Sequence, residues 1–384
     1  MQMVYLDHAA TTPIFPEVVE AMTDYLREHY GNPSSLHSFG REAKAYLEQA
    51  RNDVAGLINA SPDDVFFTSG GTESDNAAIM GSAAVTNKRH LITSSVEHHA
   101  VLDTCEYLSE QGFDVTVLDV DEHGMVQPET LKKALRDDTF LVTVMHANNE
   151  VGTINPIKEL ARLAHEAGAL FHVDAVQSVG KIEVDVADLA VDMLTFSAHK
   201  INGPKGVGAL YKRKELNLQR RAFGGGQEKK LRSGTENLPG IVGFGKAAAQ
   251  TRLTWRKEAA RCRELRDLFV SELLNSIAAS RLNGHPVMRL PHNANMSFDY
   301  IEGEALLLHL DLQGIACSSG SACSSGTQSP SHVLSAMGLS DSWLHSAVRF
   351  TLGYGVDERQ IRYVIQVLKD KVGLLRKASP FYHE

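Results

Sequence analysis

The sequence predicts an α/β protein in which helices cover both faces of a mostly parallel sheet, followed by a smaller α/β unit. Two observations lead to this prediction. From about residue 60, short apolar runs of β type alternate with segments of helical periodicity. The chain is also 384 residues long with 43% hydrophobic residues, which suits two domains that share a large core better than one small domain.

The first part of the chain contains the runs that we expect to form the main sheet. A Gly-rich turn and a helix follow the first run, and apolar spacing predicts another helix over 157–168 that ends at Gly168. The expected strands are VFFT (65–68), HLITSS (90–95), FDVTVLDV (113–120), FLVTVMH (140–146), LFHVD (170–174), DMLTFS (192–197) and GVGALY (206–211).

Sequence patterns in the rest of the chain predict the smaller unit. Long amphipathic helices are expected at about 236–280, before the run NANMSFDY (293–300) and a helix that contains EALLLHLD (304–311). A Ser-, Gly- and Cys-rich segment and a last helix from about residue 357 complete it. We therefore expect a large domain over 12–260 and a small domain formed by 1–11 and 261–384.

Composition excludes several classes of protein. The formal net charge of -9 argues against direct binding to nucleic acid, which usually requires a basic surplus. The first residues lack the basic start and apolar run of a signal peptide, and no apolar stretch approaches the ~20 residues that span a bilayer. We expect a cytoplasmic protein without membrane contact. Its four cysteines are too few for a disulfide framework and lack the spacing of a zinc site, so no metal is expected.

The most informative segment surrounds Lys200. Ser197-Ala198-His199-Lys200 ends a predicted strand and enters a Gly-rich loop. A lysine at a strand end can point into the crevice where α/β sheets hold their ligands. Desolvation and nearby cations lower the pKa of a lysine and make it nucleophilic toward an aldehyde.

Other polar residues in the same order along the chain suit pyridoxal 5'-phosphate (PLP). Asp174 closes a predicted strand, and an acid at the pyridine nitrogen would keep that ring protonated as an electron sink. Gln177 can bond the phenolic oxygen of the ring. The segment 69–73, SGGTE, joins a strand to a helix, and its backbone and Thr72 can bind the phosphate. Each feature alone more often has an ordinary structural role; their combination on one βα scaffold indicates the cofactor.

These segments resemble the cysteine desulfurases of the NifS and IscS group, within the fold-type I, aspartate aminotransferase-like PLP enzymes. The resemblance extends over nearly the whole chain. It rests on YLDHAATTP (5–13), GNPSSLHSFG (31–40), FTSGGTESDN (67–76), SSVEHHAVLDTC (94–105), MHANNEVGTINPI (145–157), FHVDAVQSVGK (171–181), FSAHKINGPKGVGALY (196–211), GGGQEKKLRSGTEN (224–237), SSGSAC (318–323) and VRFTLG (348–353).

The resemblance implies a role for individual residues around the cofactor ring. Lys200 would carry PLP in a covalent linkage, Asp174 would contact the pyridine nitrogen and Gln177 the ring oxygen. His98 would stack on the ring and help to move protons. Asn149 would lie beside the ring and the substrate. A buried histidine with a purely structural role is the alternative for His98.

The resemblance also implies the phosphate, substrate and subunit contacts. Thr72, Ser197, His199 and the backbone of Gly71 would bind the phosphate, and Thr235 would reach the phosphate of the other subunit in a homodimer. Arg349 would grip the carboxylate of L-cysteine, with Asn32 and the backbone near Ala9 and Ala10 at the same end of the site. A structural salt bridge is the alternative for Arg349, and capping of a helix that begins near 236 is the alternative for Thr235.

Cys323 lies in SSGSACSSGTQSPSH and matches the catalytic cysteine of this family. The resemblance implies that Cys323 takes sulfur from L-cysteine as a persulfide, leaves L-alanine, and passes the sulfur to acceptors for iron–sulfur cluster assembly or tRNA thiolation. Cys317 follows the apolar run GIA, which suggests a strand and a buried structural thiol. Cys105 and Cys262 fall in helical patterns and invite no chemical role.

Two other functions remain open at the level of sequence. A selenocysteine lyase, or another PLP enzyme that eliminates at Cβ or transfers an amino group, would use the same cofactor residues. A sulfur-relay protein, whose main function is to bind partner proteins, would need the loop after Cys323 to reach an external acceptor.

Overall fold

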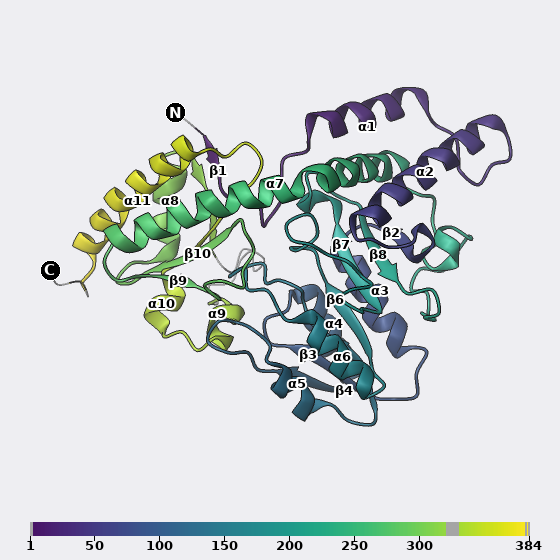
Figure 1. The fold of residues 1–384 in the computed structure, drawn as a ribbon, viewed down its shortest axis with the longest axis horizontal. Helices are drawn as coiled ribbons and strands as arrows, with labels where there is room; N and C mark the ends of the chain where they lie inside the picture. Colours follow the sequence, from purple (N-terminus) through teal and green to yellow (C-terminus); the bar gives the residue numbers. More distant parts are fainter. Residues whose placement is uncertain (1–2, 320–329, 381, 383–384) are drawn as a thin grey trace.

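The computed structural model describes residues 3–319, 330–380 and 382 (Figure 1). A seven-stranded sheet forms the larger part, with the strand order β2-β8-β7-β6-β5-β3-β4. Pairing is parallel throughout except at β8, which is antiparallel to both of its neighbours. The strands are β2 (Val65–Thr68), β3 (His90–Ser94), β4 (Asp114–Leu118), β5 (Thr139–Thr143), β6 (Leu170–Asp174), β7 (Met193–Ser197) and β8 (Gly208–Lys212), which confirms the seven predicted strands.

Helices cover both faces of this sheet because alternate strand residues point to opposite sides. Leu91, Leu141 and Met193 pack on one face with α3 (Gly71–Ala83) and α4 (His99–Glu110). Their neighbours Ile92, Val142 and Leu194 face the other side. The helices that cover that side are α1 (Pro16–Glu28), α2 (Ser38–Leu57), α5 (Pro128–Ala134), α6 (Ile157–Glu166) and the first part of α7 (Leu238–Ser276).

Helix α6 confirms the prediction for 157–168, and it ends as the sequence indicates. Its hydrogen-bonded turns stop at Glu166, and Gly168 then adopts a left-handed backbone with φ of 70°. Glycine adopts this conformation without the penalty that a side chain brings. Three short 3-10 helices, η1 (Pro62–Asp64), η2 (Ala198–Lys200) and η3 (Glu228–Lys230), connect other elements of this part.

Helix α7 differs from the expectation of several helices between 236 and 280, because it is one continuous helix of 39 residues (Figure 1). The Asn237 side chain caps its start by accepting a hydrogen bond from the Gly240 amide, so Thr235 is not the cap. The helix runs through residue 260 and packs on both core regions. The predicted limit between the two domains falls inside α7 and stays a prediction.

The smaller part contains an antiparallel sheet with the order β12-β13-β10-β9. The end of α7, α8 (Gly303–Asp311) and α11 (Glu358–Ala378) pack on it. The N-terminal strand β1 (Val4–Tyr5) joins this part by parallel pairing with β11 (Ile315–Ala316). The remaining elements are β9 (Ser280–Asn283), β10 (Asn293–Phe298), β12 (Ser318–Ser319), β13 (Ala347–Thr351), α9 (His332–Ala336) and α10 (Asp341–His345).

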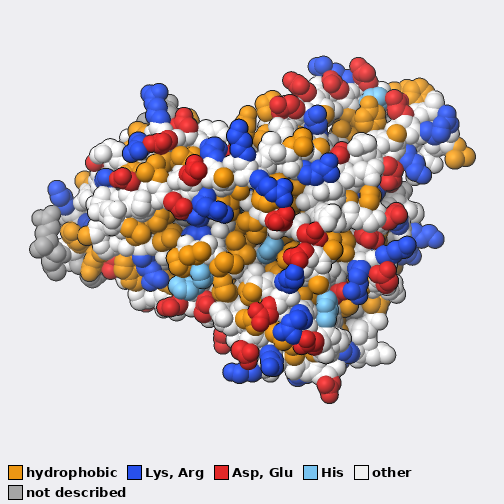
Figure 2. Space-filling view, in the orientation of Figure 1, with side chains coloured by type: hydrophobic (Ala, Val, Ile, Leu, Met, Phe, Trp, Pro, Cys, Tyr) orange, Lys and Arg blue, Asp and Glu red, His pale blue; other side chains and the backbone are white. Residues whose placement is uncertain are grey.

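The surface mixes both signs of charge. Figure 2 shows acidic and basic side chains side by side over one face of the molecule, as expected for a chain with 38 basic and 47 acidic residues. In the described part of the chain, no helix combines the length and the apolar character that crossing a membrane requires.

Candidate active site

Lys200 lies where strand β7 ends and the chain turns through η2. Its Nζ donates hydrogen bonds to the carbonyl oxygens of Ala9 and Ala10, the latter at 2.8 Å. The Gln177 side chain donates to the same Ala9 oxygen at 3.0 Å. Ala9 and Ala10 are here named the N-terminal strap. The structure thus brings Lys200 and Gln177 against this strap, which lies more than 160 residues before them in the chain.

Asp174 ends the neighbouring strand β6 and is only 6% exposed. One carboxylate oxygen accepts a hydrogen bond from the Val176 amide at 2.8 Å. Burial raises the pKa of Asp174, while the charges of His98 and Lys200 lower it. A buried carboxylate calls for a cationic partner, and a protonated pyridine ring is such a partner. The residues at this strand edge therefore fit the ring of PLP.

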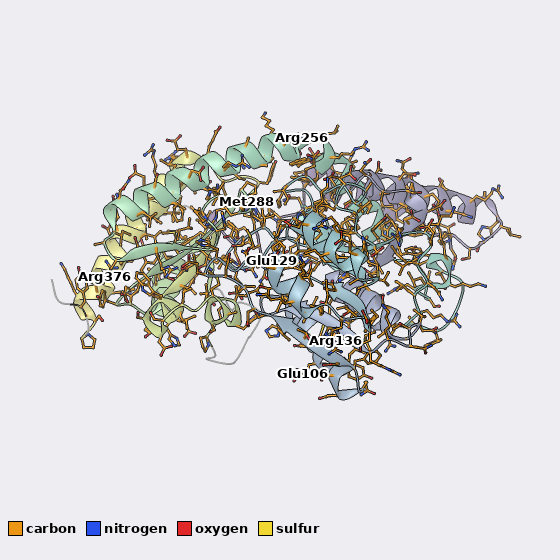
Figure 3. The ribbon with its side chains drawn as sticks, turned by 60° about the horizontal axis from the view of Figure 1, so that its bottom comes forward. Glu106, Glu129, Arg136, Arg256, Met288 and Arg376 are labelled. Atoms are coloured by element: carbon orange, nitrogen blue, oxygen red, sulfur yellow. The ribbon has the colours of Figure 1, made fainter. Side chains whose placement is uncertain are left out.

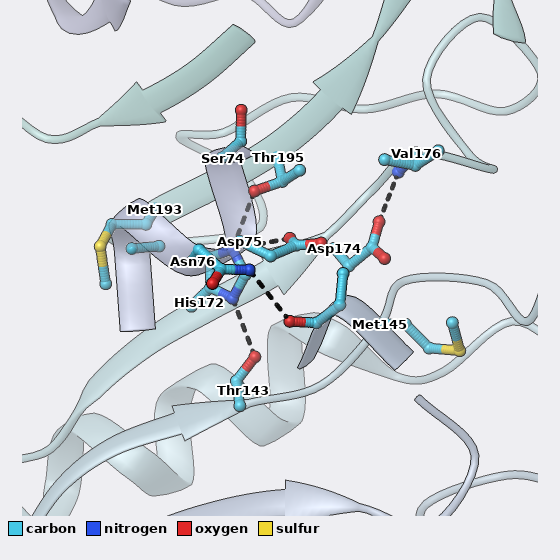
Figure 4. A network of polar contacts seen from close by, with 12 residues as sticks. Ser74, Asp75, Asn76, Thr143, Met145, His172, Asp174, Val176, Met193 and Thr195 are labelled. Atoms are coloured by element: carbon cyan, nitrogen blue, oxygen red, sulfur yellow. Dashed lines mark hydrogen bonds and ion pairs between the residues drawn. The ribbon is translucent and has the colours of Figure 1, made fainter. Parts of the chain in front are cut away.

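A buried polar network lies beside Asp174 (Figure 4). His172 bonds Thr143 at 2.8 Å and Thr195 at 3.0 Å, and its Nε2 lies 3.6 Å from the Asp75 carboxylate. Burial lowers the pKa of His172 to about 3, so the ring is neutral. Burial and the nearby Asp174 raise the pKa of Asp75 well above its usual value. Burial also raises the pKa of Asp174, so this pair of carboxyl groups favours holding a proton.

We did not identify this network from the sequence, although one signal was present. His172 and Asp174 stand two residues apart in LFHVD and therefore share a face of the strand. The sequence pattern assigns a role to Asp174 alone and none to His172. Asp75 gave no comparable signal, because its contact depends on how α3 crosses the sheet.

The start of α3 forms a pocket of about 470 Å³ next to Lys200. Four predicted phosphate ligands line it: Gly71, Thr72, Ser197 and His199. A side chain at position 71 would bring its Cβ within 2.9 Å of Val176, so glycine is required for this close approach. Lys205, which sequence reasoning missed, adds a cation. Backbone amides at the helix start, hydroxyl groups and a cation together suit a phosphate group.

His98 is the N-cap of α4, and its Nδ1 accepts a hydrogen bond from the Ala100 amide at 3.1 Å. It is half-buried, in contrast to the fully buried structural histidine considered as the alternative. Its charge acts on Asp174, which places the two side chains near each other. Asn149 is also half-buried, and its carbonyl oxygen accepts a hydrogen bond from Arg349 at 3.0 Å.

Arg349 lies on β13 and is 3% exposed. Its guanidinium forms an ion pair with Asp7 at 2.9 Å, which is the structural salt bridge considered as the alternative. Its Nε has no hydrogen-bond partner among the described residues. The carboxylate-binding role of Arg349 stays a prediction, and the unsatisfied N–H group leaves a donor for it.

Two predicted site residues, Asn32 and Thr235, are exposed and do not line the pocket beside Lys200. The Asn32 side chain accepts a hydrogen bond from the Ser34 amide at 2.9 Å, which is a local turn contact. Contact of Thr235 with a second subunit stays a prediction.

Cys323 lies outside the described residues. The other three cysteines are free thiols whose pKa is raised by burial, to about 12 for Cys105. Cys317 departs in part from its prediction, because β11 ends at Ala316 and Cys317 is half-buried just beyond it. Thiols held in the protonated form are poor nucleophiles, in agreement with structural roles for these three.

Two buried glutamates flank the site and were missed, since nothing in their spacing distinguishes them. Glu97, next to His98, accepts hydrogen bonds from Ser94 at 2.5 Å and from the Met145 amide at 2.9 Å. Glu150, next to Asn149, accepts one from Ser331 at 2.5 Å. Burial raises the pKa of Glu97 to about 8 and that of Glu150 to about 7.

Comparison with known proteins places this geometry in context. Residues 4–364 match the family model described as aminotransferase class-V. The chain is 52% identical to the cysteine desulfurase IscS of Dictyoglomus turgidum, over 99% of this chain and 97% of that protein. It is 50% identical to cysteine desulfurase IscS 1 of Archaeoglobus fulgidus, over 99% of this chain and the whole of that protein.

Solved structures give the same picture. A NifS-like protein superposes with a TM-score of 0.92 at 39% identity, covering 97% of this chain and all of that one. SspA in complex with cysteine superposes with a TM-score of 0.82 at 36% identity, covering 91% of this chain and 99% of that one. The seven-stranded mixed sheet and the small antiparallel sheet are thus similar to those of NifS-like structures.

Proposed function

The chain belongs to the class-V aminotransferase family and is a PLP-dependent cysteine desulfurase, and from this we propose how its own residues convert L-cysteine to L-alanine and a Cys323 persulfide. The observation that carries this proposal is the convergence at the ends of β6 and β7. A buried acid, a lysine held by strap carbonyls and an anion pocket meet there.

The residues at this edge would hold the cofactor as follows. Lys200 would bind PLP covalently, Asp174 would contact the ring nitrogen and Gln177 the ring oxygen, and His98 would stack on the ring. Gly71, Thr72, Ser197 and His199 bind the phosphate, to which Lys205 adds a positive charge. When bound, PLP withdraws electrons from the α- and β-carbons of the substrate.

Lys200 also provides the base. With L-cysteine in the site, its Nζ atom would take the α-proton and return a proton later. Its present hydrogen bonds to Ala9 and Ala10 show that the strap can hold Nζ at the strand edge. These carbonyls orient the amine and receive no proton.

Arg349 would bind the substrate carboxylate through donors that include its unsatisfied Nε. Asp7 and the Asn149 carbonyl hold the guanidinium in place, which limits the entropy lost when the substrate binds. Asn149 and Asn32 would complete the substrate contacts.

Cys323 would act on sulfur. Its thiolate attacks the substrate sulfur, a new S–S bond forms, and the Cβ–S bond breaks with its electron pair going to Cβ. Protonation of Cβ gives alanine. The terminal sulfur then leaves to another thiol or to a partner protein, such as an iron–sulfur scaffold or a tRNA-thiolation enzyme. We further propose that the enzyme is a homodimer in which Thr235 contacts the phosphate bound by the other subunit.

Replacement of single cysteines tests the assignment of Cys323. The Cys323→Ser enzyme should keep its bound cofactor and the absorbance change on addition of L-cysteine, yet form neither a persulfide nor alanine in repeated turnover. Mass spectrometry of the protein and alanine analysis measure both. The matched control Cys317→Ser should turn over at the normal rate, because its half-buried thiol has no catalytic role here. Normal turnover by Cys323→Ser would refute the assignment.

A further inference from the structure

A second pocket, here named the Lys181 pocket, lies apart from the pocket beside Lys200. It has a volume of about 40 Å³ and is bordered by the large sheet region, the middle of α7 and the loop after β13. Its lining includes Lys181, Asn202, Trp255, Glu258, His292 and Gly353. The mechanism proposed above uses none of these residues.

The Lys181 ammonium group lacks a partner in this pocket. Within residues 3–319, 330–380 and 382, the Lys181 side chain forms no hydrogen bond or ion pair. The Lys181 side chain is half-buried. Burial lowers its pKa, while the charges of Cys262 and Glu258 raise it. A counter-charge in the pocket would give the ammonium group a partner.

The acidic residue of the pocket is already paired. The Glu258 carboxylate accepts hydrogen bonds from Arg261 at 2.9 and 3.1 Å. Arg261 also donates to the Gly353 carbonyl at 2.9 Å and to the Val356 carbonyl. The Arg261–Glu258 pair is therefore neutral as a unit, so Glu258 compensates the charge of Lys181 only in part.

Two buried histidines add unsatisfied ring nitrogens around Lys181. His8 and His292 are each 2% exposed. Neither nitrogen of His8, nor Nδ1 of His292, has a partner among the described residues. Burial and the charge of Lys181 lower the pKa of both rings, to about 3 for His8, so both are neutral. Each neutral imidazole carries one N–H donor and one acceptor nitrogen, and the Lys181 ammonium group adds donors only.

We propose that the Lys181 pocket binds a small monovalent anion, such as a halide or a short carboxylate, against the Lys181 ammonium group. The volume admits only one or a few groups of the size of water. One lysine whose charge is compensated only in part matches one negative charge. The rings of Phe15, Trp255 and Tyr354 line the pocket, and aromatic edges carry the positive end of the ring quadrupole. Exclusion of water strengthens the attraction.

Bromide is a suitable probe for two reasons. It quenches the fluorescence of a nearby tryptophan, and it raises the Tm of the protein if it binds the folded state in the Lys181 pocket. The holoenzyme with Trp343→Phe retains Trp255 as its single tryptophan. Titration with bromide against gluconate at constant ionic strength should give saturable quenching of Trp255 and a rising Tm. At ten times the dissociation constant, the unfolding equilibrium constant should fall about 11-fold.

Two substitutions identify the cation responsible. Lys181→Met should abolish both effects. Arg256→Met is the matched control: Arg256 lies on the outside of α7 (Figure 3), stacks 4.6 Å from the Trp255 ring and pairs with Glu183. It should leave saturable binding intact. Lys181→Gln, which is also uncharged but polar, should likewise abolish both effects and keeps the test valid if Lys181→Met does not fold.

The opposite pattern would overturn the proposal. Linear quenching without a change in Tm would mean that water alone solvates Lys181. Loss of quenching in Arg256→Met, but not in Lys181→Met, would place the halide on the surface instead. Because neither readout involves turnover, both are independent of the proposed desulfurase mechanism.

Discussion

Asp75 and Asp174 occupy one buried region, where burial raises the pKa of both, but their surroundings differ. Asp174 faces the charges of Lys200 and His98, which favour its anion. Asp75 lies against the neutral His172 and is nearly inaccessible to water, at 1% exposure. Two adjacent carboxyl groups without full compensation do not both ionise. We infer that Asp75 retains a proton so that Asp174 can serve as the anion for the cofactor ring.

Amide substitutions separate these two roles. Asp75→Asn mimics a protonated acid, so the visible absorbance of the bound cofactor and its pH dependence should change little. Asp174→Asn removes the anion at the ring nitrogen, and turnover should fall by about 100-fold or more, as for loss of one preorganised electrostatic contact. Absorbance titration and the rate of alanine formation measure the effects. Equal losses in the two variants would contradict the division of roles.

Glu150 predicts a pH dependence of stability. Its pKa rises from 4.5 to about 7 on folding, because burial disfavours the charge. Between these values the unfolded chain has lost the proton and the folded chain keeps it, so stability falls as pH rises. The shift corresponds to about 3 kcal/mol, fully present below pH 4.5 and lost by about pH 7.

The Glu150→Gln variant should show a shallower slope, because glutamine can still accept the Ser331 hydrogen bond without ionising, while Glu97 keeps its own contribution. Urea unfolding of the holoenzyme at several pH values between 5 and 8 tests this. Glu106→Gln is the control, since Glu106 is exposed on α4 (Figure 3) and its loss should leave the slope unchanged. An unchanged slope in Glu150→Gln would mean that Glu150 is ionised in the folded protein.

At the level of elements, α7 is positioned by glycines. Gly245 faces α2 so closely that an added Cβ would come within 2.6 Å of the Ala50 Cα atom. Gly243 faces Met22 of α1 at the same distance. These close approaches hold α1, α2 and the first half of α7 together. The three helices pack on one face of the sheet, against residues of β6 and β7. The position of the active-site edge therefore depends on helix packing some distance away.

Two glycine substitutions with opposite expected signs test this packing. Gly245→Ala should destabilise the protein by about 1–3 kcal/mol, because backbone atoms of α2 cannot yield as a side chain could. Gly373→Ala, in the exposed middle of α11 with open space around it, should stabilise by about 0.5–1 kcal/mol. Chemical denaturation measures both. Stabilisation by Gly245→Ala would contradict the described contact.

Sequence patterns predicted the main sheet well, because strands buried in a parallel sheet consist of continuous apolar runs. They predicted the extent of an element less well where tertiary contacts determine it. The continuity of α7 through residue 260 follows from packing on both core regions, and neither periodicity nor capping residues distinguish one helix from two. Cys317 shows the same limit, since a strand of two residues cannot be delimited from an apolar flank alone.

The same contrast holds for the site. Lys200, Asp174, Gly71 and Thr72 stand at strand ends or at a helix start, so local sequence already fixes their position relative to the sheet edge. Asp75 reaches the site only because α3 crosses the sheet there. Glu97 and Glu150 are chain neighbours of His98 and Asn149, but their burial, which sets their pKa, comes from tertiary packing. Both sequence and structure were needed for Arg349. Its motif indicated a place in the site, and only the structure showed that Asp7 forms an ion pair with it.

At the scale of the whole molecule, the proposed homodimer makes each site composite. Thr235 is exposed, 35 residues beyond Lys200, and outside the pocket beside it. If Thr235 acts on the partner's cofactor, the inactive Lys200→Ala chain and a weakened Thr235→Ala chain should complement each other. A mixed dimer then regains one intact site, which combines Lys200 of one chain with Thr235 of the other. Co-expression with two affinity tags and assay of the purified mixed dimer test this; activity no higher than that of the Thr235→Ala chain would place Thr235 in its own subunit's site.

The most direct test of the account is the stoichiometry of products from L-cysteine. The purified protein is incubated with L-cysteine and a thiol reductant, and alanine and sulfide are quantified together with pyruvate and ammonia. A desulfurase that works through Cys323 should release alanine and sulfide in equal amounts over many turnovers per chain. Pyruvate and ammonia in place of alanine would contradict the account and indicate an enzyme that eliminates at Cβ.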